Sequence, residues 1–232
     1  MTNLRILAEG FTEVRFANEV LIPHLAGFGV YGSASMVVTS GRRGSKEGQG
    51  GGCTYLAWKK DITDWIKAEG HRSDFWFTSM LDLYGLAAFT DSFPGYDECR
   101  GLPDPNKKVA GLEEAWGNDI GFQHFIPHLQ LHEFEALLLV DLSVLKLQFI
   151  KQSREIDTLI AEIHDAGKPP EQIDEGRETA PSKRIIHHLP QYGLRKAGAG
   201  SLAAGTIGLP RLRRDCPHFG AWLAKLESLG NA

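Results

Sequence analysis

The sequence LRILAEGFTEVR, residues 4–15, decides the fold that the rest of the chain completes. Its apolar residues up to Ala8 predict a short buried strand, and Gly10 marks a turn into a helix that begins at Phe11. Glu9 therefore stands at the carboxyl end of a first strand, the edge where open α/β sheets carry their functional groups. Glu13 falls in the first helical turn. It either points toward that edge or only stabilises the helix N-terminus, by ~0.3–1 kcal/mol.

Length and composition are those of an ordinary globular protein. The 232 residues, 42% hydrophobic and 23% charged, suffice for one sizeable domain or for a domain with a helical appendage. The net charge of −4 argues against a generally basic nucleic-acid coat protein, although residues 182–214 carry cations without any acid. Three widely spaced cysteines, Cys53, Cys99 and Cys216, form no disulfide or zinc pattern and favour a reducing cytoplasm. We expect neither a signal peptide nor a membrane span.

Three further segments are predicted strands. The second covers residues 30–39, and the third, FWFTSML at 75–81, is apolar throughout, as expected of a central parallel strand. It ends in Asp82. The fourth, HFIPHLQL at 124–131, runs into Glu133. Each of these last two strands therefore ends close to a carboxylate, as the first strand does at Glu9.

Helical patterns alternate with these strands and then replace them. Residues 55–68 and 107–116 are predicted helices, and beyond Val144 only helical segments follow, which we expect Gly198 and Gly200 to interrupt. This order predicts an α/β fold with a four-stranded, mainly parallel sheet flanked by helices. We expect a domain over residues 1–141 and a helical C-terminal extension over 142–232 packed on it, which is a segment suited to forming a homodimer.

A glycine-rich basic loop, SGRRGSKEGQGGGC at residues 40–53, follows the second strand. Its cations Arg42, Arg43 and Lys46 and its backbone amides suit phosphate binding. The alternative is a solvated, disordered loop. The segment is not a P-loop, because Gly-Lys-Ser/Thr in the required register is absent.

The histidines at 124, 128 and 132 have a spacing that suggests zinc only on a helix. Pro127 argues against a helix here. On a strand, four residues cover ~13 Å, which is too far for one ion. We therefore do not expect the three histidines to share a metal.

The three strand-end acids, Glu9, Asp82 and Glu133, are expected at one edge of the sheet. Glu135 joins them only if the chain stays extended that far, because residues two apart on a helix face away from each other. Converging carboxylates persist when they hold cations, and oxygen ligands favour Mg²⁺ or Mn²⁺. Such a site suits phosphodiester hydrolysis, in which Lys183 or Arg184 neutralises phosphate charge. Otherwise the acids only cap helices at strand–helix junctions.

Several segments together resemble the bacterial DUF4276 family: EGFTEVRF, SMLDLYGL, FPG, FIPHLQLHEFEALL, PSKRI and CPHFGAWL. The resemblance covers nearly the whole chain, and HLQLHEFEALL is its most specific part. That family is similar to the Toprim-like superfamily, and more closely to the Toprim half of the overcoming-lysogenization-defect (OLD) nucleases. The resemblance implies that Glu9 is general acid/base and metal ligand, and that Lys183 is catalytic. It implies Asp82 and Glu133 as further ligands and Glu13 and Glu135 as supports.

The chain departs from the Toprim pattern at Tyr84, which stands where the second acid of Asp-x-Asp is expected. Either Glu133 or Glu135 replaces that acid, or one metal site is weakened. OLD nucleases carry an ATPase that is missing from this sequence, so the resemblance implies a separate ATPase partner and a role in defence against phage or plasmids.

Two other functions remain open at this point. One is a catalytically silent regulatory or nucleic-acid-binding subunit of an ATPase complex, and the other is a small-molecule phosphohydrolase.

Overall fold

The computed structural model describes residues 1–36, 55–89, 93–173, 176 and 179–231. Its parallel sheet has the strand order β2-β1-β3-β4, and β5 also pairs with β3. The strands are β1 (Thr2–Ala8), β2 (Val30–Met36), β3 (Phe75–Asp82), β4 (Phe125–Ile126) and β5 (Leu129–Gln130). The predicted α/β fold with a parallel sheet and a helical C-terminal region is confirmed. Residues 37–39 of the predicted second strand lie outside the described residues.

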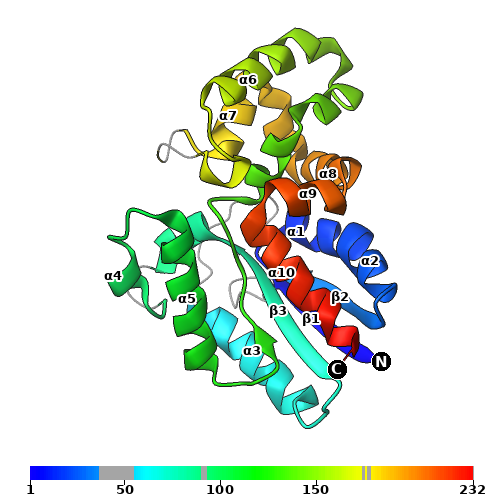
Figure 1. Cartoon of the computed structure of the whole chain (residues 1–232), viewed down its shortest axis with the longest axis vertical. Helices are drawn as coiled ribbons and strands as arrows, with labels where there is room; N and C mark the ends of the chain where they lie inside the picture. Colours follow the sequence, from blue (N-terminus) through cyan, green and yellow to red (C-terminus); the bar gives the residue numbers. More distant parts are fainter. Residues whose placement is uncertain (37–54, 90–92, 174–175, 177–178, 232) are drawn as a thin grey trace.

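Helices cover both faces of the sheet, and Figure 1 shows α3 and α5 on the side away from α1, α2 and α10. The first half of the chain contributes α1 (Phe11–Phe16), the π-helical η1 (Ala17–Leu21), α2 (Ile22–Ala26), α3 (Tyr55–Glu69), the 3₁₀ segment η2 (Leu83–Phe89), α4 (Tyr96–Cys99) and α5 (Pro105–Ile120). The last helix against the sheet is α10 (Pro217–Ser228), followed by the 3₁₀ turn η7 (Leu229–Asn231).

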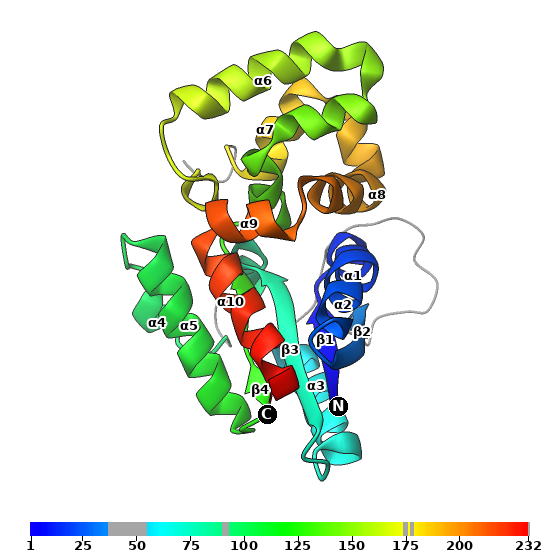
Figure 2. The same cartoon turned by 45° about the vertical axis from the view of Figure 1, so that its right-hand side comes forward.

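The remaining helices lie beyond one end of the sheet, where α6, α7 and α8 gather (Figure 2). Four 3₁₀ segments lead into or between them: η3 (Phe134–Val140), η4 (Leu142–Leu147), η5 (Ile150–Gln152) and η6 (Pro170–Gln172). The α-helices are α6 (Ser153–Asp165), α7 (Pro181–His188), α8 (Pro190–Ile207) and α9 (Leu209–Asp215). Among the described helices, none has the length and apolar character needed to cross a membrane.

The alternation of side chains along β1 sorts the core into two clusters. Leu4 and Ile6 face the cluster that contains α1, α2 and α10, whereas Leu7 faces the cluster of α3 and α5. Successive side chains of a strand point to opposite faces of the sheet, so neighbouring residues of β1 enter different clusters. The first cluster joins Leu4 to Leu223, so it spans the predicted boundary at residue 141. The division into two domains stays a prediction.

The predicted fourth strand is wrong as one continuous element. Pro127 separates β4 from β5 and has no amide to donate to a ladder. At His128 the Ser79 side chain takes the place of the backbone hydrogen bonds between strands. The His128 amide donates to Ser79 Oγ at 2.8 Å, and Ser79 Oγ donates to the His128 carbonyl at 3.0 Å.

The predicted interruption at Gly198 and Gly200 is also wrong, because both lie inside α8. A Cβ on Gly200 would lie 2.9 Å from Tyr192 Oη and 3.0 Å from Thr12 Cγ2. A Cβ on Gly198 would lie 3.1 Å from Arg15 Nη1. The glycines therefore permit close packing of α8 on α1, and that tertiary contact outweighs their low helix propensity of about 1 kcal/mol each.

Candidate functional site

The register of the sheet brings the carboxylates of Glu9 and Asp82 together. Ala8 pairs with Met80, and the Glu9 amide continues the ladder by donating to the Met80 carbonyl at 3.1 Å. Glu9 Oε2 accepts a hydrogen bond from the Asp82 amide at 3.0 Å. Gly85 leaves the necessary space, because a Cβ on it would lie 2.7 Å from Glu9 Oε2. Both strand ends thus contribute to one site at the edge of the sheet.

Glu13 points inward from the first turn of α1 and is only 5% exposed. Gly10 precedes the helix with an extended backbone, and a Cβ on it would lie 3.0 Å from Glu13 Oε2. The Glu13 carboxylate interacts electrostatically with those of Glu9 and Asp82. Of the two interpretations that the sequence left open, the structure supports the one in which Glu13 joins the strand-end acids.

Glu133 and Glu135 reach the same region from the segment after β5. His132 has a positive φ of 62°, which turns the chain, and Glu133 then has an extended backbone at the start of η3. Glu133 Oε2 accepts a hydrogen bond from the Ser182 amide at 2.9 Å. The expectation that Glu135 joins only on an extended chain is wrong. Since Glu133 precedes the helix and only Glu135 lies in it, helical periodicity does not separate their side chains.

Lys196 on α8 supplies positive charge to these acids. Its Nζ lies 3.1 Å from Glu135 Oε2, and Tyr192 Oη donates to Glu135 Oε1 at 2.8 Å. Tyr192 and Lys196 are four residues apart and so share one face of α8. We call this group the carboxylate cluster; it consists of Glu9, Glu13, Asp82, Glu133 and Glu135, with Lys196 and Tyr192 as its partners.

The surroundings raise several pKa values in the carboxylate cluster. Burial is the main cause for Glu9, Glu13, Asp82 and Glu135, and the pKa of Glu13 rises to about 7. The pKa of Asp82 is raised further by Glu9 and Glu13. Burial alone would lower the pKa of Lys196, but the neighbouring carboxylates, Glu135 first, raise it. The lysine therefore stays charged, while the acids resist ionisation.

The five carboxylates of the cluster belong to residues of different exposure. Glu135 is fully buried, Asp82 and Glu133 are half-buried, and Glu9 has an exposed surface. The Glu9 carboxylate itself faces inward against Gly85 and the Asp82 amide, and there burial raises its pKa.

The donor atoms of the cluster fit a hard divalent cation. All are carboxylate oxygens, the ligands that Mg²⁺ and Mn²⁺ prefer. Asp82 Oδ1 is buried and has no hydrogen-bond partner among the described residues. Within the same ranges, the three-residue group whose ligand atoms lie within 4.8 Å of one another is a different one, Glu113, His128 and His218.

The whole of this site lies in a stretch that matches a known protein family. The match is to a domain of unknown function, DUF4276, and it covers residues 8–227. The chain belongs to the DUF4276 family. No curated protein and no solved structure matches this DUF4276 chain. The family match includes β3, η3 and α8, so it covers every residue of the carboxylate cluster.

Of the predicted phosphate-binding residues of the DUF4276 chain, the structure describes Lys183 and Arg184, which follow Ser182 on α7. Lys183 on α7 is exposed, and Lys196 is the lysine that acts on the carboxylates. Arg184 forms an ion pair with Glu162. The roles of Lys183 and Arg184 stay predictions. Those of Arg42, Arg43 and Lys46 do too, since these three residues lie outside the described part of the chain.

The three histidines considered for zinc lie in separate surroundings. Each stacks or packs on a different aromatic ring: His124 on Trp76, His128 on Trp222 and His132 on Tyr84.

Sequence reasoning did not identify Lys196 or Tyr192. The four-residue spacing of Tyr192 and Lys196 would place them on one face of a helix. The sequence did not predict that helix, because Gly198 argued against a continuous helix here.

Proposed function

We propose that this DUF4276 protein is a Mg²⁺- or Mn²⁺-dependent, Toprim-like nuclease that hydrolyses phosphodiester bonds of nucleic acid. The observation that carries the proposal is the gathering of five carboxylates around Lys196, with Glu13 and Glu135 buried. Grouped carboxylates in a poorly solvated place resist ionisation unless cations balance their charge. One lysine balances one of them. A divalent cation would balance two more.

Glu9, Asp82 and Glu133 would hold the cation. Asp82 Oδ1 is buried and has no hydrogen-bond partner in the described structure, and Glu9 Oε2 accepts from the Asp82 amide. Glu135 is a positioning residue, because Tyr192 and Lys196 already engage its two oxygens. The chemistry that a cation supplies at such a site is polarisation of a phosphoryl oxygen and activation of water.

Two side chains would then act on the substrate. Glu13, buried beside Glu9 and Asp82, would exchange the proton, a task that the resemblance assigned to Glu9. Lys196 keeps its charge beside the carboxylates and would stabilise negative charge that develops on the phosphate. The resemblance assigned that role to Lys183.

The biological setting is proposed by analogy with the OLD nucleases. A separate ATPase would control the nuclease, and the pair would act in the cytoplasm against phage or plasmid nucleic acid. The free thiols of Cys99 and Cys216 suit a reducing compartment. This part of the proposal rests on fold-level analogy alone.

Tyr84 favours a second candidate function, that of a catalytically silent subunit of an ATPase complex. It stands at the position of the second Asp-x-Asp acid, and its amide donates to the His132 carbonyl at 3.1 Å. A tyrosine hydroxyl is a poor Mg²⁺ ligand at neutral pH, since its proton stays on. A silent subunit would not need a cation at Asp82.

Nicking of supercoiled plasmid, with an RNA pool alongside, tests the nuclease proposal. Wild type, Glu9→Gln and Asp82→Asn are compared in Mn²⁺ and in EDTA. Glu98→Gln on α4 is the matched control, because Glu98 is exposed. We expect metal-dependent cleavage by wild type and control, and at least ~100-fold less by the two cluster variants. Equal cleavage by all four proteins would show contamination and contradict the assignment.

A further inference from the structure

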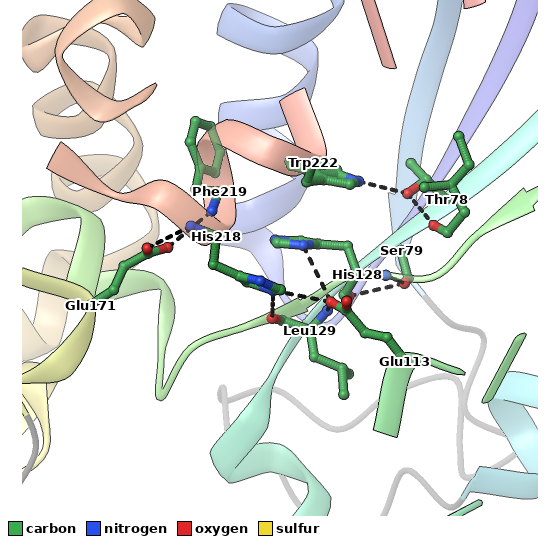
Figure 3. A network of polar contacts seen from close by, with 10 residues as sticks. Thr78, Ser79, Glu113, His128, Leu129, Glu171, His218, Phe219 and Trp222 are labelled. Atoms are coloured by element: carbon green, nitrogen blue, oxygen red, sulfur yellow. Dashed lines mark hydrogen bonds and ion pairs between the residues drawn. The ribbon is translucent and has the colours of Figure 1, made fainter. Parts of the chain in front are cut away.

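A second polar cluster lies at the edge of the sheet where α5 and α10 meet (Figures 2 and 3). Glu113 comes from α5, His128 from the link between β4 and β5, and His218 from the first turn of α10. His218 Nε2 lies 3.0 Å from Glu113 Oε1, and His128 Nδ1 lies 3.6 Å from the same oxygen. One ligand atom from each residue lies within 4.8 Å of the other two.

These separations are those of a tetrahedral metal site. Ligands bound to zinc at about 2.0–2.1 Å lie about 3.3 Å from one another, and two imidazole rings on one zinc have centres about 5 Å apart. The distances of 3.0 and 3.6 Å to Glu113 Oε1 lie on either side of the expected value. The ring centres of His128 and His218 are 5.0 Å apart. Small side-chain movements would therefore bring all three ligands onto one ion.

The backbone carbonyl oxygen of Leu129 is a fourth potential ligand atom at the same place. This oxygen lies 3.0 Å from His218 Nε2, and the Leu129 amide donates to Glu113 Oε1 at 2.8 Å. Without an ion, His218 Nε2 shares its proton between these two oxygens. His128 Nδ1, at 3.6 Å from Glu113, is beyond hydrogen-bond distance although the residue is only 1% exposed. An ion bound at Nδ1 would hold the His128 ring on that side, while its buried Nε2 has no hydrogen-bond partner among the described residues.

The surrounding structure holds His128 in a fixed orientation, as Figure 3 shows. Ser79 Oγ binds both the amide and the carbonyl of His128. The ring of His128 stacks on that of Trp222, with centres 4.2 Å apart and planes 8° apart. Trp222 is fixed in turn, because its Nε1 donates to Thr78 Oγ1 at 2.8 Å.

Glu171 fixes His218 through the start of α10. Its carboxylate accepts hydrogen bonds from the amides of His218, at 2.9 Å, and Phe219, at 3.0 Å. Outer contacts of this kind orient metal ligands in proteins, and their loss typically lowers metal affinity about 10–100-fold. The two histidines are therefore already oriented before any ion binds.

We propose that Glu113, His128 and His218 bind one Zn²⁺ ion, which fastens α10 to α5 across the interrupted edge strand. Two imidazole nitrogens with one carboxylate favour zinc over Mg²⁺. The site is thus distinct in chemistry from the carboxylate cluster. The side chains of Glu113 and His218 are 13% and 16% exposed, which gives the ion a path from solvent. Since the proposal concerns stability, it does not depend on nuclease activity.

Zn²⁺ binding to the full chain, after EDTA treatment and dialysis, tests the proposal. Calorimetry with Zn²⁺, in excess Mg²⁺ to occupy the carboxylate cluster, is expected to give one equivalent bound, and Zn²⁺ to raise the unfolding temperature. Glu113→Gln and His218→Gln are expected to bind Zn²⁺ at least about tenfold more weakly. Two controls are expected to match wild type: His164→Gln, which replaces a histidine that is 90% exposed, and Asp82→Asn, which alters the carboxylate cluster.

Visible absorption of the Co²⁺-loaded wild type provides a readout that needs no variant. Tetrahedral coordination by nitrogen and oxygen gives an intense visible band, whereas octahedral or loosely bound Co²⁺ does not. If stoichiometric Zn²⁺ binding or that band is absent, Glu113, His128 and His218 form no metal site, and the proposal is overturned. So would Zn²⁺ binding that is lost in Asp82→Asn and kept in Glu113→Gln.

Discussion

Replacing Glu13 with Gln removes one ionisable group from the carboxylate cluster and keeps its shape. The pKa of Glu13 rises from 4.5 to about 7 on folding, chiefly through burial. The folded protein therefore holds a proton that the unfolded chain releases. The resulting stabilisation is full below about pH 4.5 and is lost as the pH rises through about 7. At about 1.4 kcal/mol per pH unit, the loss is about 3 kcal/mol of unfolding free energy.

Urea unfolding in EDTA at about pH 5 and about pH 8 measures this loss. Wild type is expected to be less stable at the higher pH, and the loss in Glu13→Gln to be smaller by about 2–3 kcal/mol. Glu9, Asp82 and Glu135 also have raised pKa values, so the variant is expected to keep part of the pH dependence. Mn²⁺ at about pH 8 is expected to restore stability to wild type.

The exposed Glu98→Gln serves as the control and should follow wild type at both pH values. The reasoning would be refuted if Glu13→Gln and wild type lost the same free energy.

Three further substitutions test the packing of the site. Gly85→Ala places a Cβ 2.7 Å from Glu9 Oε2 and is expected to weaken Mn²⁺ binding at least about tenfold by calorimetry; unchanged binding would show that Glu9 is not needed there. Tyr192→Phe removes the hydrogen bond to buried Glu135 and is expected to cost about 1.5–3 kcal/mol in urea unfolding; a neutral effect would argue against that bond. Gly200→Ala places a Cβ 2.9 Å from Tyr192 Oη and is expected to cost about 1–3 kcal/mol, whereas a more stable variant would mean that α8 can shift from α1.

The sheet and the strand-end acids of the site, Glu9 and Asp82 with Glu133, were predictable because their signals are local. The apolar run before Glu9 and the one before Asp82 are short and continuous, as parallel strands require. Parallel strands in one sheet then place their carboxyl ends at one edge, so convergence of the two acids followed from the strand assignment. The register that puts the Asp82 amide 3.0 Å from Glu9 Oε2 agrees with that expectation.

The remaining features depend on contacts between residues far apart in the chain. Gly200 suggests a helix break when only its neighbours are considered, yet it packs against α1. Lys196 reaches Glu135 through that same packing. His128 meets His218 only after the sheet edge and α10 have come together, and no spacing along the sequence carries that information.

The central claim is that the carboxylate cluster holds a divalent cation, and Mn²⁺ binding measured by calorimetry tests it most directly. Wild type is expected to bind Mn²⁺ saturably. Glu9→Gln and Asp82→Asn are expected to bind at least about tenfold more weakly, and Glu113→Gln to bind like wild type. Mn²⁺ binding that is absent in wild type, or equal in wild type and Asp82→Asn, would contradict the claim.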